Sequence, residues 1–263
     1  MGLFAAVGRR AVKRWEGIEE NLSFLGEAFA SAFATLFAPH RFRFADCALV
    51  FERAAVAGAP ISIGIGFLLG LILAFESAAA LQMFGAEVYV ADLLAIGLFR
   101  ELGPLITAII LAGRSGSAFA AEIGTMKVDE ELDALRTMGL EPVQFLVMPR
   151  IVAATLAMPA LTICCELSGL VGGALVLRMM DVPPAVYWKH VTSMSSQFII
   201  LFGLAKAALF GFIIALIGCG AGMNTKSTAD GVGVAATRAV VNSIVAIAVA
   251  DGIIAVLCYV WDL

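Results

Sequence analysis

Long apolar runs dominate the chain and alternate with short polar connections. A helix needs about 20 mostly apolar residues to cross the hydrocarbon core of a bilayer, and five segments reach that length: Ala54–Leu81, Val88–Ala112, Ile151–Leu177, Phe198–Ile217 and Ala239–Val260. These runs are continuous, whereas the strands of a membrane β-barrel alternate in polarity over about ten residues. The pattern therefore predicts an all-α integral membrane fold with five transmembrane helices.

The first 45 residues have an amphipathic pattern instead. Apolar side chains such as Leu22, Leu25, Phe29 and Phe33 recur at helical spacing, with glutamates between them. A helix of this kind lies in the membrane interface or packs on the spans as an ordinary tertiary helix, and the pattern leaves both open. We expect an N-terminal interfacial region, 1–45, followed by a membrane domain, 46–263.

Lysine and arginine are distributed unequally between the two sides of the predicted spans. The segments 1–53, 113–150 and 218–238 carry thirteen of them, whereas the connections on the other side carry only Arg178 and Lys189. Cytoplasmic loops of membrane proteins are enriched in these residues. The count predicts a cytoplasmic N-terminus and a C-terminus on the outer side.

The composition agrees with a membrane protein and excludes several other classes. Hydrophobic residues make up 61% of the chain and charged residues 14%, against about 45–50% and 25% in soluble domains. The formal net charge of −4 argues against nucleic acid as a partner, because such binders carry a basic surface. The five cysteines are odd in number and form no C-x-x-C, so we expect neither a disulfide framework nor a metal site.

The connection between the second and third spans contains a short amphipathic helix, expected at about 128–138. Its apolar face consists of Val128, Leu132, Leu135 and Met138. Acidic residues in the first turn, Asp129, Glu130 and Glu131, and Arg136 in the last turn suit the helix dipole, and Gly139 provides a left-handed stop. Such a helix docks in a groove of a soluble partner or connects two spans on its own protein, and the pattern does not decide.

The candidate functional residues among the ionisable side chains inside the predicted spans are Glu76, Arg100, Glu101, Glu166, Lys206 and Asp251. A charge at the bilayer centre costs about 2.5–3.5 kcal/mol on insertion scales, so these residues usually face a partner or a cavity. Lys206 and Glu166 lie at similar depths, roughly 12 and 15 Å from the outer ends of their spans at about 1.5 Å per residue, and are expected to pair. Arg100 and Glu101 point about 100° apart, which favours a hydrated cavity open to the outside.

The chain has no sequence pattern of an enzyme active site. The stretch at 220–227 lacks the glycine that a phosphate-binding loop needs before Lys226, and the segments outside the spans are too short for an ATPase domain. Three functions remain: a transporter subunit driven by a partner, a proton-coupled secondary carrier of apolar solutes with Glu101, Glu166 and Asp251 as relay groups, and a non-transporting scaffold.

Several motifs between residues 100 and 150 resemble the MlaE family, the permease subunits of ATP-driven lipid transporters in bacterial envelopes. They are Arg100-Glu101-Leu102-Gly103-Pro104, Ala112-Gly113-Arg114-Ser115-Gly116-Ser117-Ala118, Asp133-Ala134-Leu135-Arg136 with Gly139, and Pro149-Arg150. The resemblance extends from about Asp46 to the C-terminus. It implies a homodimer in the bacterial inner membrane, with five spans and an interfacial helix per protomer.

The resemblance also implies partners and site residues. Two cytoplasmic ABC ATPase subunits would grip the short helix through Val128, Asp129, Glu130, Glu131, Leu132, Leu135 and Arg136. A hexameric MCE-domain protein would sit on the periplasmic side, and a STAS-domain protein would bind the ATPase. The permease itself would need no cofactor or metal, because ATP is bound by the partner.

The substrate implied by the resemblance is phospholipid, moved between the inner and outer membranes to maintain outer-membrane lipid asymmetry. In the family, the lipid occupies a cavity between the two protomers that opens to the outside. Arg100, Glu101 and Leu102 match the residues that line this cavity, and Leu81, Phe84 and Lys206 are further candidates for it.

Overall fold

Long helices packed side by side form the structure, a computed structural model that describes residues 43–261 together with 24, 26–27 and 30–31. The described part contains helices and no strands. The predicted interfacial helix within 1–45 lies almost wholly outside the described residues. Of that region, Phe24 is buried and lies next to Gly220 near the end of the fourth span.

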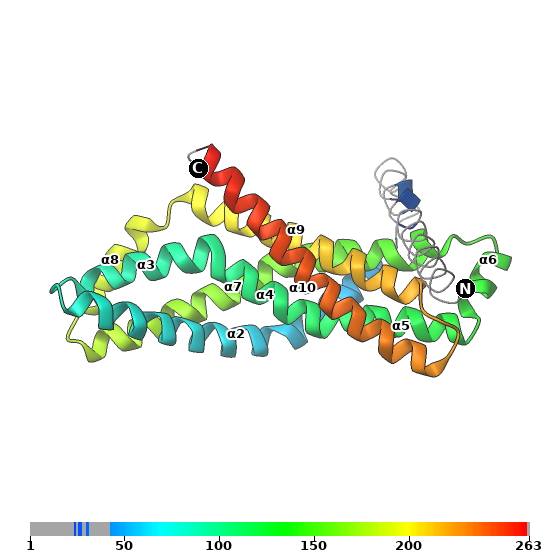
Figure 1. Ribbon diagram of the computed structural model, residues 1–263, viewed down its shortest axis with the longest axis horizontal. Helices are drawn as coiled ribbons and strands as arrows, with labels where there is room; N and C mark the ends of the chain where they lie inside the picture. The colour runs from blue at the N-terminus through cyan, green and yellow to red at the C-terminus, as the bar shows by residue number, and fades with distance from the viewer. Residues whose placement is uncertain (1–23, 25, 28–29, 32–42, 262–263) are drawn as a thin grey trace, which may run out of the picture.

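All five predicted spans are confirmed, and each helix extends beyond its apolar run. The helices long and apolar enough to cross a membrane are α2 (Phe44–Gln82), a composite second helix (Glu87–Val128), a third (Val143–Met179), α9 (Gln197–Met223) and α10 (Ala229–Val260). The bundle has two ends (Figure 1): short helix α8 (Pro184–Met194) marks one, and short helix α6 (Glu131–Thr137) marks the other. We refer to them as the α8 end and the α6 end.

The second and third spans are not uniform α-helices. The second consists of η2 (Glu87–Tyr89), α3 (Val90–Gly97), η3 (Leu98–Leu102), α4 (Gly103–Leu111), η4 (Ala112–Gly116) and α5 (Ser117–Val128). The third begins with η5 (Val143–Val147) and continues as α7 (Met148–Met179). The segments η3, η4 and η5 are π-helical turns, which occur frequently at functional sites.

Helices α2 and α7 form the most extensive contact in the bundle, and glycines make it possible. A Cβ atom on Gly70 would lie 1.9 Å from the carbonyl oxygen of Gly169, and one on Gly66 would lie 2.3 Å from the carbonyl oxygen of Cys165. Membrane helices associate through such small-residue faces because backbones must approach closely without help from the hydrophobic effect. This pairing fixes the scaffold on which the second span is held.

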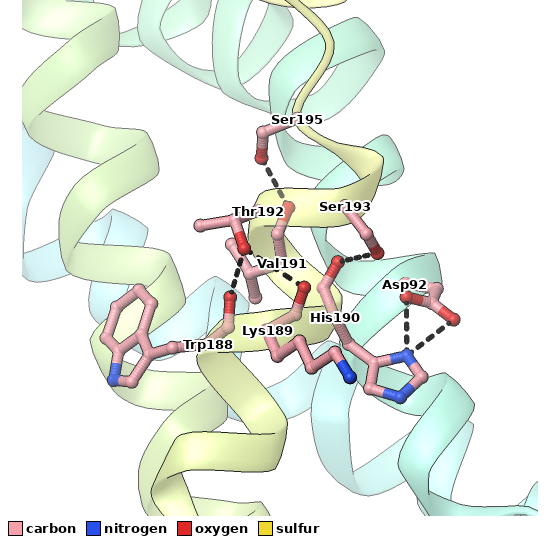
Figure 2. A network of polar contacts seen from close by, with 8 residues as sticks. All are labelled: Asp92, Trp188, Lys189, His190, Val191, Thr192, Ser193 and Ser195. Atoms are coloured by element: carbon pink, nitrogen blue, oxygen red, sulfur yellow. Dashed lines mark hydrogen bonds and ion pairs between the residues drawn. The ribbon is translucent and has the colours of Figure 1, made fainter.

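At the α8 end, polar contacts fasten α8 to its neighbours. The Tyr187 hydroxyl donates to the carbonyl of Leu170 at 2.7 Å, and burial raises the pKa of Tyr187 above its usual range. Figure 2 shows His190 reaching across to Asp92 on α3, with its Nδ1 atom 3.0 and 3.1 Å from the two carboxylate oxygens. These contacts hold α8 against α3 and α7.

The expected helix at 128–138 is wrong in its extent. Val128 ends α5, and the chain then breaks at Glu130, whose φ of 59° is left-handed, before α6 begins at Glu131. The predicted stop is confirmed: Gly139 has φ +75°, its N–H donates to Arg136, and the N–H of Leu140 donates to Leu135. The connection is therefore a bent hairpin with a helix of seven residues.

Candidate functional site

A cluster of three charged side chains lies within the spans, contributed by three different elements. Lys206 on α9 is almost fully buried, and its Nζ atom contacts a carboxylate oxygen of Glu101 on η3 and, at 2.5 Å, Oδ1 of Asp251 on α10. Arg100 lies beside them, with its Nε atom 3.9 Å from the second oxygen of Glu101. Two carboxylates thus share one buried ammonium, and the more exposed arginine lies at the edge of the cluster.

Local backbone geometry brings Lys206 to this position. Pro104 has no N–H, so it cannot donate to the carbonyl of Arg100 one turn earlier in the helix. The Lys206 ammonium approaches that same carbonyl oxygen at 3.5 Å. One turn before Lys206 on α9, Gly203 lies so close to η3 that a Cβ atom there would be 2.0 Å from the carbonyl oxygen of Phe99. A proline and a glycine together therefore let α9 close onto the π-helical turn.

A small cavity opens beside the cluster. Its volume is about 270 Å³, and its lining consists of Arg100, Ser196, Phe198, Ile199, Phe202 and Cys258. The rings of Phe198 and Phe202 stack with centroids 6.1 Å apart. The cavity therefore presents one cationic group at an otherwise largely apolar wall, which is the chemistry that an amphiphile with an anionic headgroup requires.

The expected pairing of Glu166 with Lys206 is wrong. Lys206 is committed to Glu101 and Asp251, while Glu166 on α7 is buried beside Gly103, where a Cβ atom would lie 2.9 Å from Oε1 of Glu166. Depth along a span does not specify which neighbouring helix a side chain faces. Asp251, roughly 14 Å from the outer end of its span, matches Lys206 equally well in depth, and its helix packs against α9.

The other predicted cavity residues are placed differently. Leu102 is half-buried on η3, directly after Arg100 and Glu101. Leu81 and Phe84 lie at the α8 end, where α2 ends and the turn after it begins. Since α2 packs mainly on α7 and α3 and has no extensive contact with α9 or α10, these two residues are not part of the cluster within one protomer.

The predicted partner-contacting residues around α6 separate into two groups. Leu132 and Leu135 are buried, and both belong to the main hydrophobic core of this chain. The exposed side consists of acidic residues, Arg136, which pairs with Asp133 at 3.1 Å, and Met138, which is 65% exposed. Leu132 and Leu135 therefore anchor the hairpin, and the polar side with Met138 is the surface available to another molecule.

The described residues contain no group of three or more His, Cys, Asp or Glu side chains arranged to hold a metal ion. The charged residues of the cluster are bonded to one another. The arrangement can therefore bind an anionic or zwitterionic headgroup through Arg100 and hold apolar chains along the aromatic wall.

Comparison with known proteins identifies relatives along most of the chain. A family model described as Permease MlaE matches residues 50–257. A probable ABC transporter permease protein of Rickettsia prowazekii is 38% identical over 196 residues, which is 74% of this chain and 76% of the relative. The intermembrane phospholipid transport system permease protein MlaE of Haemophilus influenzae is 36% identical over 180 residues, 68% of this chain and 69% of the relative. The chloroplastic protein TRIGALACTOSYLDIACYLGLYCEROL 1 of Arabidopsis thaliana is 36% identical over 197 residues, 73% of this chain and 56% of the relative.

Proposed function

The chain belongs to the MlaE permease family of ABC transporters, and from this premise we propose that it moves phospholipid between the inner and outer membranes. As an ABC permease it is a membrane subunit without an ATPase domain, so the ATP is hydrolysed by partner subunits. A secondary carrier driven by protons would need no such partner, and family membership therefore favours the ATP-driven alternative. The name of the Haemophilus relative, an intermembrane phospholipid transport system permease protein, supports phospholipid as the substrate.

The observation that carries the proposal is the cavity beside the buried charge cluster. Arg100 would hold the phosphate, because a guanidinium donates two parallel hydrogen bonds to phosphate oxygens, and Phe198 and Phe202 would contact the acyl chains. Glu101 and Lys206 would keep Arg100 in place, since Glu101 contacts both cations. Leu102, Leu81 and Phe84 remain proposed lining residues of the complete route.

The cavity in one protomer is smaller than most ligand pockets, which hold about 300–1,000 Å³. Helix α10 carries Asp251 of the cluster, and only 17% of its most apolar stretch is buried against the rest of the protomer. We propose that a second copy of the chain packs here and completes the cavity as a homodimer. The route would continue into an MCE-domain hexamer on the periplasmic side.

Two ABC ATPase subunits would bind at the α6 end, which we place in the cytoplasm because of the uneven distribution of Lys and Arg. The contact would be made by the exposed residues around α6, Asp129, Glu130, Glu131 and Arg136, with Val128 at the end of α5. Leu132 and Leu135 would transmit the movement of this hairpin into the core. A STAS-domain protein would bind the ATPase. The assembly would reside in the bacterial inner membrane.

Reconstituted transport tests the proposal. The permease and its ATPase are placed in vesicles, and transfer of a fluorescent phospholipid to acceptor vesicles is followed with ATP, or with a pH gradient and no ATP. We expect ATP-dependent transfer that falls at least ten-fold in Arg100→Gln, while the control Arg178→Gln at the α8 end transfers normally. Transfer driven by the pH gradient alone would support the carrier, and no transfer by an intact complex would support the scaffold.

A further inference from the structure

A second groove lies at the α6-end boundary of the hydrocarbon region, far along the spans from the charge cluster. Its volume is about 610 Å³, and it runs between the first turns of α2 and the segment formed by η4 and α5. Leu49, Val56, Ala118 and Phe119 supply apolar lining, and Arg53 and Arg114 supply two guanidinium groups. An apolar groove with two cations at one level has the character of a lipid site.

The two arginines stand at the level of lipid headgroups. Arg53 directly precedes the first apolar run, which begins at Ala54, and Arg114 follows the second run, which ends at Ala112. The Arg114 Nη1 atom donates to the carbonyl of Arg53 at 3.3 Å. This contact brings the Arg114 guanidinium to α2 and uses one of its five N–H donors.

The charges of the groove leave a net positive site. Glu122, which also lines it, is paired with Arg150 at 2.9 Å. Within the part of the chain that the structure describes, Arg53, Arg114 and Glu52 form no ion pair. Two unpaired guanidinium groups thus face one unpaired carboxylate, an arrangement that favours a ligand with a negative phosphate.

A buried hydroxyl in the lining of the groove has no partner within the described residues. Ser115, on the π-helical turn η4, lines the groove and is only 4% exposed. Its Oγ atom has no hydrogen-bond partner among the described residues. A buried polar group left without a partner costs free energy, and a ligand oxygen in the groove would satisfy it.

We infer that this groove binds a glycerophospholipid of the adjoining leaflet, with the phosphate held by Arg53, Arg114 and Ser115. One acyl chain lies along the apolar residues of α2 and α5. The site is separate from the cavity beside Arg100, and its occupant comes from the membrane rather than from solution. Naming that leaflet cytoplasmic relies on the orientation proposed above, but the binding does not depend on transport.

Photocrosslinking tests the inference on the full-length chain in nanodiscs without ATPase or nucleotide. The photoreactive residue p-benzoylphenylalanine is introduced at position 118, which is exposed in the groove, and capture of phosphatidylglycerol is compared with capture of a diacylglycerol with the same chains. We expect capture of the phospholipid and little capture of the diacylglycerol. A juxtamembrane cation contributes about a five-fold factor in binding, so Arg53→Gln and Arg114→Gln should each lower capture about five-fold.

Matched controls separate specific binding from membrane contact. Arg178→Gln removes a cation at the opposite end and should leave capture at position 118 unchanged. The same photoreactive residue at position 171, which faces outward from α7 where Val171 is 54% exposed, should capture the two lipids equally. Ser115→Ala, which removes one hydroxyl, should weaken capture without disturbing folding. Equal capture of the two lipids, unchanged capture in both arginine variants, or crosslinking to a second copy or another protein would overturn the inference.

Discussion

The charge cluster around Lys206 and the hairpin around α6 are both necessary to the proposed transport, but they are held by opposite means. In the cluster, the buried ammonium of Lys206 on α9 contacts two partly exposed carboxylates, one from η3 and one from α10. In the hairpin, two buried leucines anchor a seven-residue helix whose other side is charged and exposed. Removing one partner from the cluster should destabilise the protein strongly. Changing the charges on the exposed side of the hairpin should alter its stability little.

The largest effect is expected at the centre of the cluster. Lys206→Met leaves Asp251 without a cation and Glu101 with Arg100 alone, and breaking a buried pair from one side costs up to about 3–5 kcal/mol. The melting temperature of the purified permease should fall markedly. Restoration of stability in the triple variant Lys206→Met, Glu101→Gln, Asp251→Asn would show that the unpaired charges are the cause, and a single variant as stable as the native protein would contradict the account.

Truncation of the hairpin anchor should have the next largest effect. Leu132→Ala removes a side chain that is 4% exposed in the main core, and such truncations cost about 2–5 kcal/mol. The matched control Met138→Ala, at a position 65% exposed, should change stability by less than about 0.5 kcal/mol. Thermal unfolding of both variants measures the difference, and equal losses would show that the hairpin is not anchored as described.

The close approach of α9 to η3 should be sensitive to a single methyl group. Gly203→Ala places a Cβ atom against the carbonyl oxygen of Phe99, and overpacking of this kind costs about 1–3 kcal/mol. Gly233→Ala, where a Cβ atom would meet nothing within 4 Å, should be neutral or slightly stabilising, because alanine is the better helix former. If the two variants changed the melting temperature by the same amount, the close approach of α9 to η3 would be ruled out.

The smallest effect on stability is expected on the exposed side of α6. Charge reversal by Glu131→Lys should change stability by less than about 0.5 kcal/mol. If the ATPase binds this surface, however, the amount of ATPase that co-purifies with the permease should fall. An unchanged yield of the complex would exclude Glu131 from the contact.

The sequence was sufficient for the architecture and only partly for the site. Continuous apolar runs predict all five spans, and Gly139 predicts the end of the hairpin helix. The break at Glu130 carries no sequence signal, since glutamate rarely adopts positive φ. Spacing gives the depth of a side chain along a span but not the direction in which it faces. The prediction from depth therefore paired Lys206 with the wrong carboxylate, Glu166. Only helix packing, which depends on Gly203 and on the π-helical turn before Pro104, selects Glu101 and Asp251.

Lipid transfer with and without ATP hydrolysis tests whether this permease moves phospholipid by means of its ATPase partner. The permease is reconstituted with native ATPase subunits, and separately with ATPase subunits that bind ATP but cannot hydrolyse it. We expect sustained transfer of phospholipid only with the native subunits, and equal assembly of the two complexes. Sustained transfer at the native rate without hydrolysis, or by the permease alone, would contradict this expectation.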